Sequence, residues 1–94
     1  MRLKWLPTAL RNLDREASQI GADEPAAARL VVKRVLAAVS MLPEQPGLGQ
    51  PGRVAGTREL GVLKTHYIVP YRVRGDTLEV LRLFHTLRQP PRQG

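Results

Sequence analysis

The chain has 94 residues and a formal net charge of +7, a size that suits one domain spanning residues 1–94 and a charge that favours acidic or anionic partners. Because it contains no cysteine, disulfide bonds, zinc–thiolate sites and thiol nucleophiles are excluded, and a reducing cytoplasm is the expected location. No segment approaches the about 20 apolar residues of a membrane span and no signal-peptide pattern follows Met1, so no membrane partner is expected.

The first part of the chain predicts a short strand and a helix. Residues 2–5 alternate polar and apolar side chains, which is typical of a strand. Pro7 suits the first turn of the helix that follows, and Gly21 is its expected end. Helical spacing predicts an apolar face made of Leu10, Leu13, Ala17 and Ile20.

A second helix is expected to begin at an N-cap, Asp23, and to end before Pro43 and Pro46. Its apolar side chains recur at the spacing of one helical face and are Ala28, Val31, Val32, Val35, Leu36, Val39 and Leu42. Since few residues separate the two helices, they should form an antiparallel hairpin.

The second half of the chain predicts a loop and three strands. Residues 44–56 are rich in Pro and Gly and are expected to form the loop. The strands are predicted at residues 57–63, 65–73 and 77–86. The predicted architecture is therefore α+β: an N-terminal strand, an antiparallel helical hairpin and a three-stranded antiparallel meander, with the two helices packed on one face of the sheet as a sandwich.

The turn at Gly75 and Asp76 predicts how the last two strands pair. A two-residue turn places Arg72 opposite Glu79, Tyr67 opposite Phe84 and His66 opposite His85. The face that the helices should cover then contains Tyr67, Val69, Tyr71, Val73, Leu78, Val80, Arg82 and Phe84. Pro70 has no N–H to donate within an interior strand, so we expect it to mark a bulge.

The order and spacing of several motifs resemble the RelE/ParE toxin superfamily of bacterial type II toxin–antitoxin modules, and most closely its ParE branch. In chain order these motifs are residues 2–5, 25–27, 49–53, 56–60, 67–73 and 79–85. The resemblance covers nearly the whole chain. Residues 90–94 are expected to be a frayed tail.

This resemblance implies a toxin that inhibits growth and a co-expressed antitoxin that neutralises it. ParE toxins are known as poisons of DNA gyrase, whereas RelE toxins cleave messenger RNA on the ribosome. Gyrase poisoning is the favoured function, and a RelE-like ribosome-dependent mRNA endoribonuclease is the alternative. An acidic antitoxin that folds on binding would suit the charge of +7 and would give a hetero-oligomer. No cofactor and no metal are implied.

A ribonuclease that uses no metal needs a proton acceptor, a proton donor and a cation for the phosphate. The candidates for these roles are His85, Arg72 and His66. A histidine near a strand end is more often a surface residue, and Arg72 has an expected cross-strand partner in Glu79. The ribonuclease branch also places an arginine about where this chain has Tyr67, which favours the poison that is not an enzyme.

Binding surfaces are expected to be cationic. The candidates for contact with gyrase or its DNA are Arg53, Arg58, Arg82, Arg88 and Arg92. The candidates for contact with the antitoxin are Trp5, Arg11, Arg15, Arg29, Lys33 and Arg34. A basic face that serves only solubility or antitoxin docking fits the first set equally well, and Trp5 also suits a core position. A simple nucleic-acid-binding module would need aromatic side chains exposed among these cations, and the few aromatics here are expected in the core.

Overall fold

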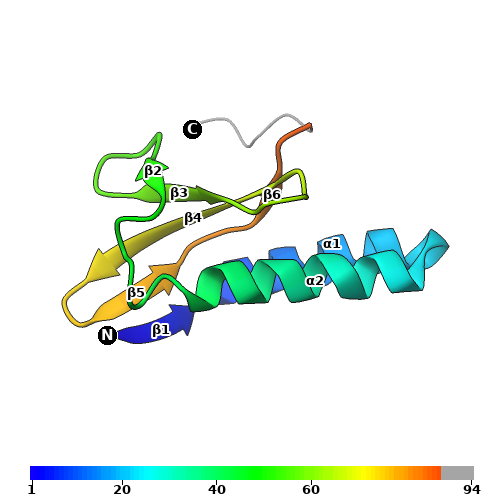
Figure 1. Ribbon diagram of the computed structural model, residues 1–94, viewed down its shortest axis with the longest axis horizontal. Helices are drawn as coiled ribbons and strands as arrows, with labels where there is room; N and C mark the ends of the chain where they lie inside the picture. Colours follow the sequence, from blue (N-terminus) through cyan, green and yellow to red (C-terminus); the bar gives the residue numbers. More distant parts are fainter. Residues whose placement is uncertain (88–94) are drawn as a thin grey trace.

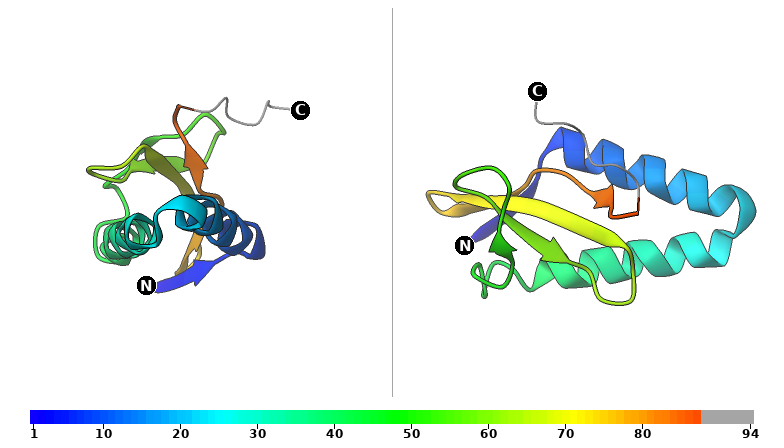
Figure 2. Two further views of the ribbon diagram at one scale, coloured as in Figure 1. Left: turned by 90° about the vertical axis from the view of Figure 1, so that its right-hand side faces the viewer. Right: turned by 90° about the horizontal axis from the view of Figure 1, so that it is seen from above.

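The computed structural model describes residues 1–87 and shows two helices packed against one face of a mixed sheet (Figures 1 and 2). The elements in chain order are β1 (Arg2–Trp5), α1 (Pro7–Asp23), α2 (Pro25–Ser40), β2 (Gln50–Pro51), β3 (Arg58–Gly61), β4 (Tyr67–Arg74), β5 (Thr77–Val80) and β6 (Phe84–His85). The strand order is β1-β5-β4-β3-β2, and β6 pairs with β4. Among the strands of the described residues, only β1 and β5 pair in parallel. The predicted α+β architecture is confirmed.

Strand β4 is the centre of the sheet because it pairs with β3, β5 and β6. Its alternate side chains Tyr67, Val69 and Tyr71 are buried against the helices. The rest of the buried core comes from Ala9, Val35, Val39, Leu42, Leu60, Val62, Leu78, Val80 and Leu83. This strand therefore carries the contact between the sheet and the helical hairpin.

The side chain of Tyr71 holds the loop after α2 against the sheet. Its hydroxyl donates to the carbonyl of Pro46 at 2.7 Å and accepts from the backbone N–H of Gly49 at 2.8 Å. The guanidinium of Arg58 donates to the carbonyl of Gly49 at 2.8 Å. A Cβ atom on Gly49 would lie 2.8 Å from the Glu59 carbonyl and from the Tyr71 ring, so the loop can approach this closely only with glycine.

Helix α1 differs from the predicted helix in its end and in its buried face. It continues past Gly21 to Asp23, and a Cβ on Gly21 would lie 3.5 Å from the Cβ of Ala28, so this glycine lies where the two helices meet. The side that faces the core consists of Ala9, Leu13, Glu16 and Ile20. Leu10, which was expected on that face, is 51% exposed. Glu16 is buried because its carboxylate accepts the Tyr67 hydroxyl at 2.8 Å, a contact that an apolar pattern does not reveal.

Helix α2 begins at Pro25 with Glu24 as its N-cap residue, so the prediction that Asp23 caps it is wrong. Asp23 instead ends α1, because a single residue connects the two helices. The predicted apolar face is confirmed for Ala28, Val35, Val39 and Leu42, which are buried. Leu36 is 46% exposed. It lies at the edge of the apolar face of α2, beyond the part of that face that packs on the core.

The single strand predicted at residues 77–86 is two strands, β5 and β6, interrupted at residues 81–83. The pairing of Arg72 with Glu79 is confirmed. Beyond the interruption the register shifts by one residue, so the pairings predicted for the two histidines and Phe84 are wrong. Tyr67 pairs with His85, and Ile68 pairs with Phe84.

Pro70 explains the interruption. The N–H of Leu81 donates to the Pro70 carbonyl at 2.9 Å, but proline has no N–H to return the second bond of an antiparallel pair. Residues 81–83 then lie opposite residues 69–70, which is the expected bulge. The extra residue exchanges the two faces: Leu83 is buried in the core, whereas Arg82, expected there, is exposed and Phe84 is half-buried.

The loop predicted at residues 44–56 contains the short strand β2, which the sequence did not indicate. The strands predicted at residues 57–63 and 65–73 are confirmed as the shorter β3 and the shifted β4. Val73, expected on the buried face, is 45% exposed near the end of β4. The predicted tail at residues 90–94 lies outside the described residues.

Replacing Tyr71 with phenylalanine tests whether its hydroxyl holds the loop. Tyr71→Phe removes both hydrogen bonds and should lower the free energy of unfolding by about 1–3 kcal/mol, because two loop backbone groups lose their partner. Urea denaturation followed by circular dichroism measures this change. Ser40→Ala, which removes an exposed hydrogen bond to Ala37, is the control and should change stability by less than about 0.5 kcal/mol. Equal stability of Tyr71→Phe and the wild type would contradict this role.

Candidate functional site

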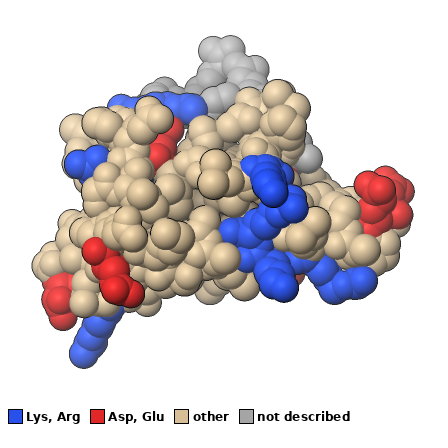
Figure 3. Space-filling model, viewed as in Figure 1, with Lys and Arg blue, Asp and Glu red and all other residues tan. Residues whose placement is uncertain are grey.

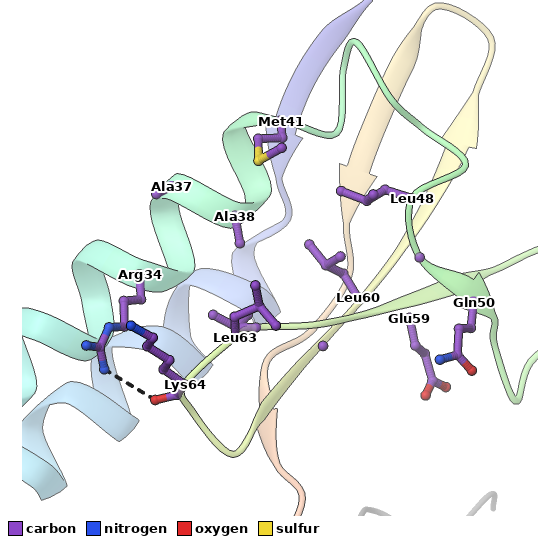
Figure 4. A pocket seen from close by; sticks show the side chains of 13 residues that line it. Arg34, Ala37, Ala38, Met41, Leu48, Gln50, Glu59, Leu60, Leu63 and Lys64 are labelled. Atoms are coloured by element: carbon purple, nitrogen blue, oxygen red, sulfur yellow. Dashed lines mark hydrogen bonds between the residues drawn. The ribbon is translucent and has the colours of Figure 1, made fainter.

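A groove of about 700 Å³ opens between α2 and β3 (Figure 4). Its apolar lining comes from α2, from the loop that Tyr71 holds and from β3 with the turn after it. These side chains are Ala37, Ala38, Met41, Leu48, Leu60, Val62 and Leu63. Met41 and Leu48 are 48% and 45% exposed, and Leu63 is 86% exposed. Apolar side chains gathered in an open groove are typical of a surface that binds a partner.

Two cations stand at one end of this groove. The guanidinium of Arg34 on α2 donates to the carbonyl of Lys64 at 3.3 Å, a bond that Figure 4 marks. Lys64 has a φ of 62°, a left-handed conformation that lysine adopts at a cost in energy. Within residues 1–87, neither Arg34 nor Lys64 has an ion-pair partner. Helix α2 and the turn after β3 therefore each present one positive charge at the end of an apolar groove.

The candidate antitoxin-binding residues fall into two groups. Arg29 and Lys33 are exposed on α2, the helix that lines the groove, and Arg34 lies in the groove itself. Figure 3 shows lysine and arginine side chains gathered over α2 and over the turn between β3 and β4. The others are on α1 or in the core: Arg11 donates to Thr8, Arg15 pairs with Glu16, and Trp5 packs half-buried against the core.

The candidate target-binding residues do not form one patch. Arg53 pairs with Glu59 and lies 5.0 Å from the ring centroid of Phe84, on the face of the sheet away from the helices. Arg58 reaches Gly49 on the opposite face. Arg82 is exposed in the bulge two residues before Phe84. Arg88 and Arg92 lie outside the described residues.

Of the three ribonuclease candidates, the two histidines lie together and Arg72 lies apart from them. His66 and His85 are neighbours, with ring centroids 5.4 Å apart. His85 pairs with Tyr67, and Arg72 lies five residues further along β4, which corresponds to about 16 Å at ~3.3 Å per residue. Arg72 cannot contact a phosphate that the two histidines hold.

Arg72 belongs instead to a charged cluster on the outer face of the sheet. Its Nε donates to the Glu79 carboxylate at 2.8 Å. This hydrogen bond lowers the pKa of Glu79 below its ordinary value near 4.5. The positive charges of Arg72, Arg74 and Lys4 lower it further, while burial acts in the opposite direction. The arrangement stabilises an ionised carboxylate and its partner.

Residues 1–87 contain no group of three metal-ligating His, Asp or Glu side chains. In the same described part of the chain, no helix is both long and apolar enough to cross a membrane. The groove itself was not foreseen from the sequence: Leu48, Leu63 and Lys64 were not singled out. A signal for it was the adjacent apolar and basic pair Leu63-Lys64 at the end of a predicted strand.

Three comparisons relate the chain to known proteins. The family model described as the ParE toxin of the type II toxin–antitoxin system, parDE, matches residues 3–90. The protein Y4kP of Sinorhizobium fredii, which is named as a toxin, is 43% identical over 90 residues, or 96% of this chain and 93% of that protein. Among solved structures, the chromosomal ParDE system from P. aeruginosa is similar with a TM-score of 0.85 and 27% identity, covering 90% of this chain and 95% of that chain. The RelBE2 toxin–antitoxin complex from Mycobacterium tuberculosis is similar with a TM-score of 0.58 and 25% identity, covering 89% and 88%.

The pair of Arg72 and Glu79 should make stability depend on pH. Because the pKa of Glu79 is lower in the folded protein, the pair stabilises the fold above pH ~4.5 and loses this effect as the pH falls through the lowered value. Arg72→Ala should raise the pKa of Glu79, observed by NMR titration of its carboxyl carbon. Denaturation of this variant should show a loss of stability at pH 7 that shrinks at pH 3. Arg74→Ala, the control, should shift the pKa less. A loss that is equal at both pH values would contradict the electrostatic role.

Proposed function

Since this chain belongs to the ParE toxin family of type II toxin–antitoxin systems, we propose that it inhibits growth by poisoning DNA gyrase until an antitoxin binds it. The gyrase target rests on the resemblance to ParE toxins, and the antitoxin partner is supported by similarity to structures of toxin–antitoxin systems. No cofactor is required for a protein that acts by holding its target.

The antitoxin binds the surface formed by α2 and the groove beside it. This surface combines exposed cations with exposed apolar side chains, which suits an acidic segment that orders itself on binding. Arg29, Lys33 and Arg34 supply the charge. Met41, Leu48 and Leu63 supply apolar contact area. The remaining candidates, Trp5, Arg11 and Arg15, contribute less because they already contact the core or neighbouring side chains on α1.

The separation of Arg72 from the two histidines is the observation that favours a poison over a nuclease. A ribonuclease needs acid, base and phosphate-binding cation around one phosphate. Here the cation lies about 16 Å along β4 from the strand position paired with His85, and it is bound to Glu79. A poison has no such requirement, because it acts through a binding surface.

Contact with gyrase is assigned to the side of the sheet that carries Arg53 and Arg82. Arg82 is exposed in the bulge. Arg53 lies over the ring of Phe84, which follows Arg82 by two residues. Arg58 contributes less, since its guanidinium is held by Gly49.

A RelE-like endoribonuclease is the second candidate. Two observations favour it: the similarity to the RelBE2 complex, and the 5.4 Å separation of the His66 and His85 rings. Two neighbouring imidazoles can act as acid and base without Arg72. Variants of these residues therefore discriminate between the two candidates.

Growth inhibition in cells tests the proposed function. Induction of the wild type should arrest growth and accumulate gyrase-linked DNA breaks. If they fold, the variants His85→Ala, His66→Ala and Arg72→Ala should remain toxic. In a nuclease, removal of the catalytic acid or base would lower activity by about 10²–10⁴-fold. Arg82→Glu should reduce toxicity, since it reverses an exposed charge at the assigned surface. Arg2→Glu, a reversal at an exposed position on β1, is the matched control. Circular dichroism checks each fold, and loss of toxicity in His85→Ala alone would sink the gyrase proposal.

A further inference from the structure

Strand β3 has an open edge that faces the groove. β2 pairs with β3 only through Gln50 opposite Glu59 and Pro51 opposite Arg58. Within residues 1–87, the next residues of β3 have a strand partner only on the β4 side. An edge of this kind presents backbone groups with which another chain can pair.

The direction of these backbone groups follows from the ladder between β3 and β4. The N–H of Val62 donates to the carbonyl of Tyr67, so the N–H and C=O of Val62 point toward β4. In an antiparallel pair the direction alternates, which turns the N–H and C=O of Gly61 away from β4. Gly61 is exposed and lines the groove. Its two backbone groups are therefore available to a chain that lies there.

The chain's own loop does not cover this edge. Extending the β2 register by two residues would place Leu48 opposite Gly61. Leu48 instead donates its N–H to the Gln45 carbonyl, within the loop that Tyr71 holds. The loop thus closes one end of the groove and leaves the edge of β3 unpaired at Gly61. On the other side of the groove, α2 presents the small side chains of Ala37 and Ala38, which leave room for a further strand.

We propose that an acidic, extended segment of the antitoxin binds in this groove as an added strand, paired with Gly61 of β3. The proposal rests on the proposed function, since it specifies how the antitoxin occupies the site. Alternate side chains of the segment pack on Leu60, Ala38 and Met41, and its carboxylates meet Arg34 and Lys64. Charge complementarity selects an acidic partner, because these two cations have no ion-pair partner within residues 1–87.

Amide exchange measured by NMR tests the added strand. The protein is compared alone and in complex with the product of the small open reading frame adjacent to its gene, obtained by co-expression. The Gly61 amide should exchange rapidly in the free protein and at least ~10-fold more slowly in the complex, because it gains a buried hydrogen bond. The Val62 amide, bonded to Tyr67 in both states, is the internal control and should exchange slowly throughout.

The variant Lys64→Gly tests the acidic contact. Glycine adopts a φ of 62° without the cost that lysine has, so the melting temperature should stay equal or rise by a few degrees. Affinity for the antitoxin should nevertheless fall several-fold, and the difference should shrink at high salt. Arg74→Ala removes one charge from the distant hairpin and is the matched control for net charge.

The outcomes separate this proposal from the proposed function. If the co-expressed protein forms no complex, the proposed antitoxin partner itself is wrong. If a complex forms and the Gly61 amide still exchanges rapidly, the added strand is wrong, and the antitoxin binds without pairing with β3. If Lys64→Gly binds as tightly as the wild type, the acidic contact at the end of the groove is wrong.

Discussion

Two buried tyrosine hydroxyls on β4 constrain how the rest of the chain is arranged. A buried hydroxyl without a hydrogen bond is costly, so each requires a partner from outside the sheet. Tyr67 donates to Glu16, which draws a carboxylate into the core and sets the orientation of α1. Tyr71 donates to Pro46 and accepts from Gly49, which fixes the loop after α2. One strand thereby positions both a helix and a loop.

The groove beside α2 follows from the second of these contacts. Because the loop is held at residues 46–49, Leu48 stays at the end of the groove and β2 pairs with only the first half of β3. The edge at Gly61 is left open next to Arg34 and Lys64. An exposed sheet edge invites unwanted pairing in a protein that acts alone. Under the proposed function, a toxin produced together with its antitoxin would offer the antitoxin this edge as a place to bind.

The sequence allowed the element types and the α+β architecture to be predicted, because periodicity and turn residues are local signals. The errors arose where a polar contact between distant residues decided the outcome. Glu16 faces the core because of Tyr67, a partner 51 positions away. The apolar pattern of α1 therefore predicted Leu13 and Ile20 correctly but chose Leu10 and Ala17 where Ala9 and Glu16 are buried. Pro70 did signal a bulge, but the position of the extra residue, and hence the burial of Leu83 in place of Arg82, depended on cross-strand pairing. The groove was missed since it is formed by a helix, a loop and a strand edge together.

In the proposed function, the target and the antitoxin bind different sides of this small protein. Arg53 and Arg82 lie on the side assigned to the target, and the groove is assigned to the antitoxin, so binding of one partner need not use the contacts of the other. A supercoiling and DNA-cleavage assay with purified gyrase, run beside a ribosome-dependent mRNA cleavage assay, tests this assignment of function most directly. The account predicts loss of supercoiling or trapped cleaved DNA with intact mRNA. Cut mRNA with unaffected gyrase would contradict it.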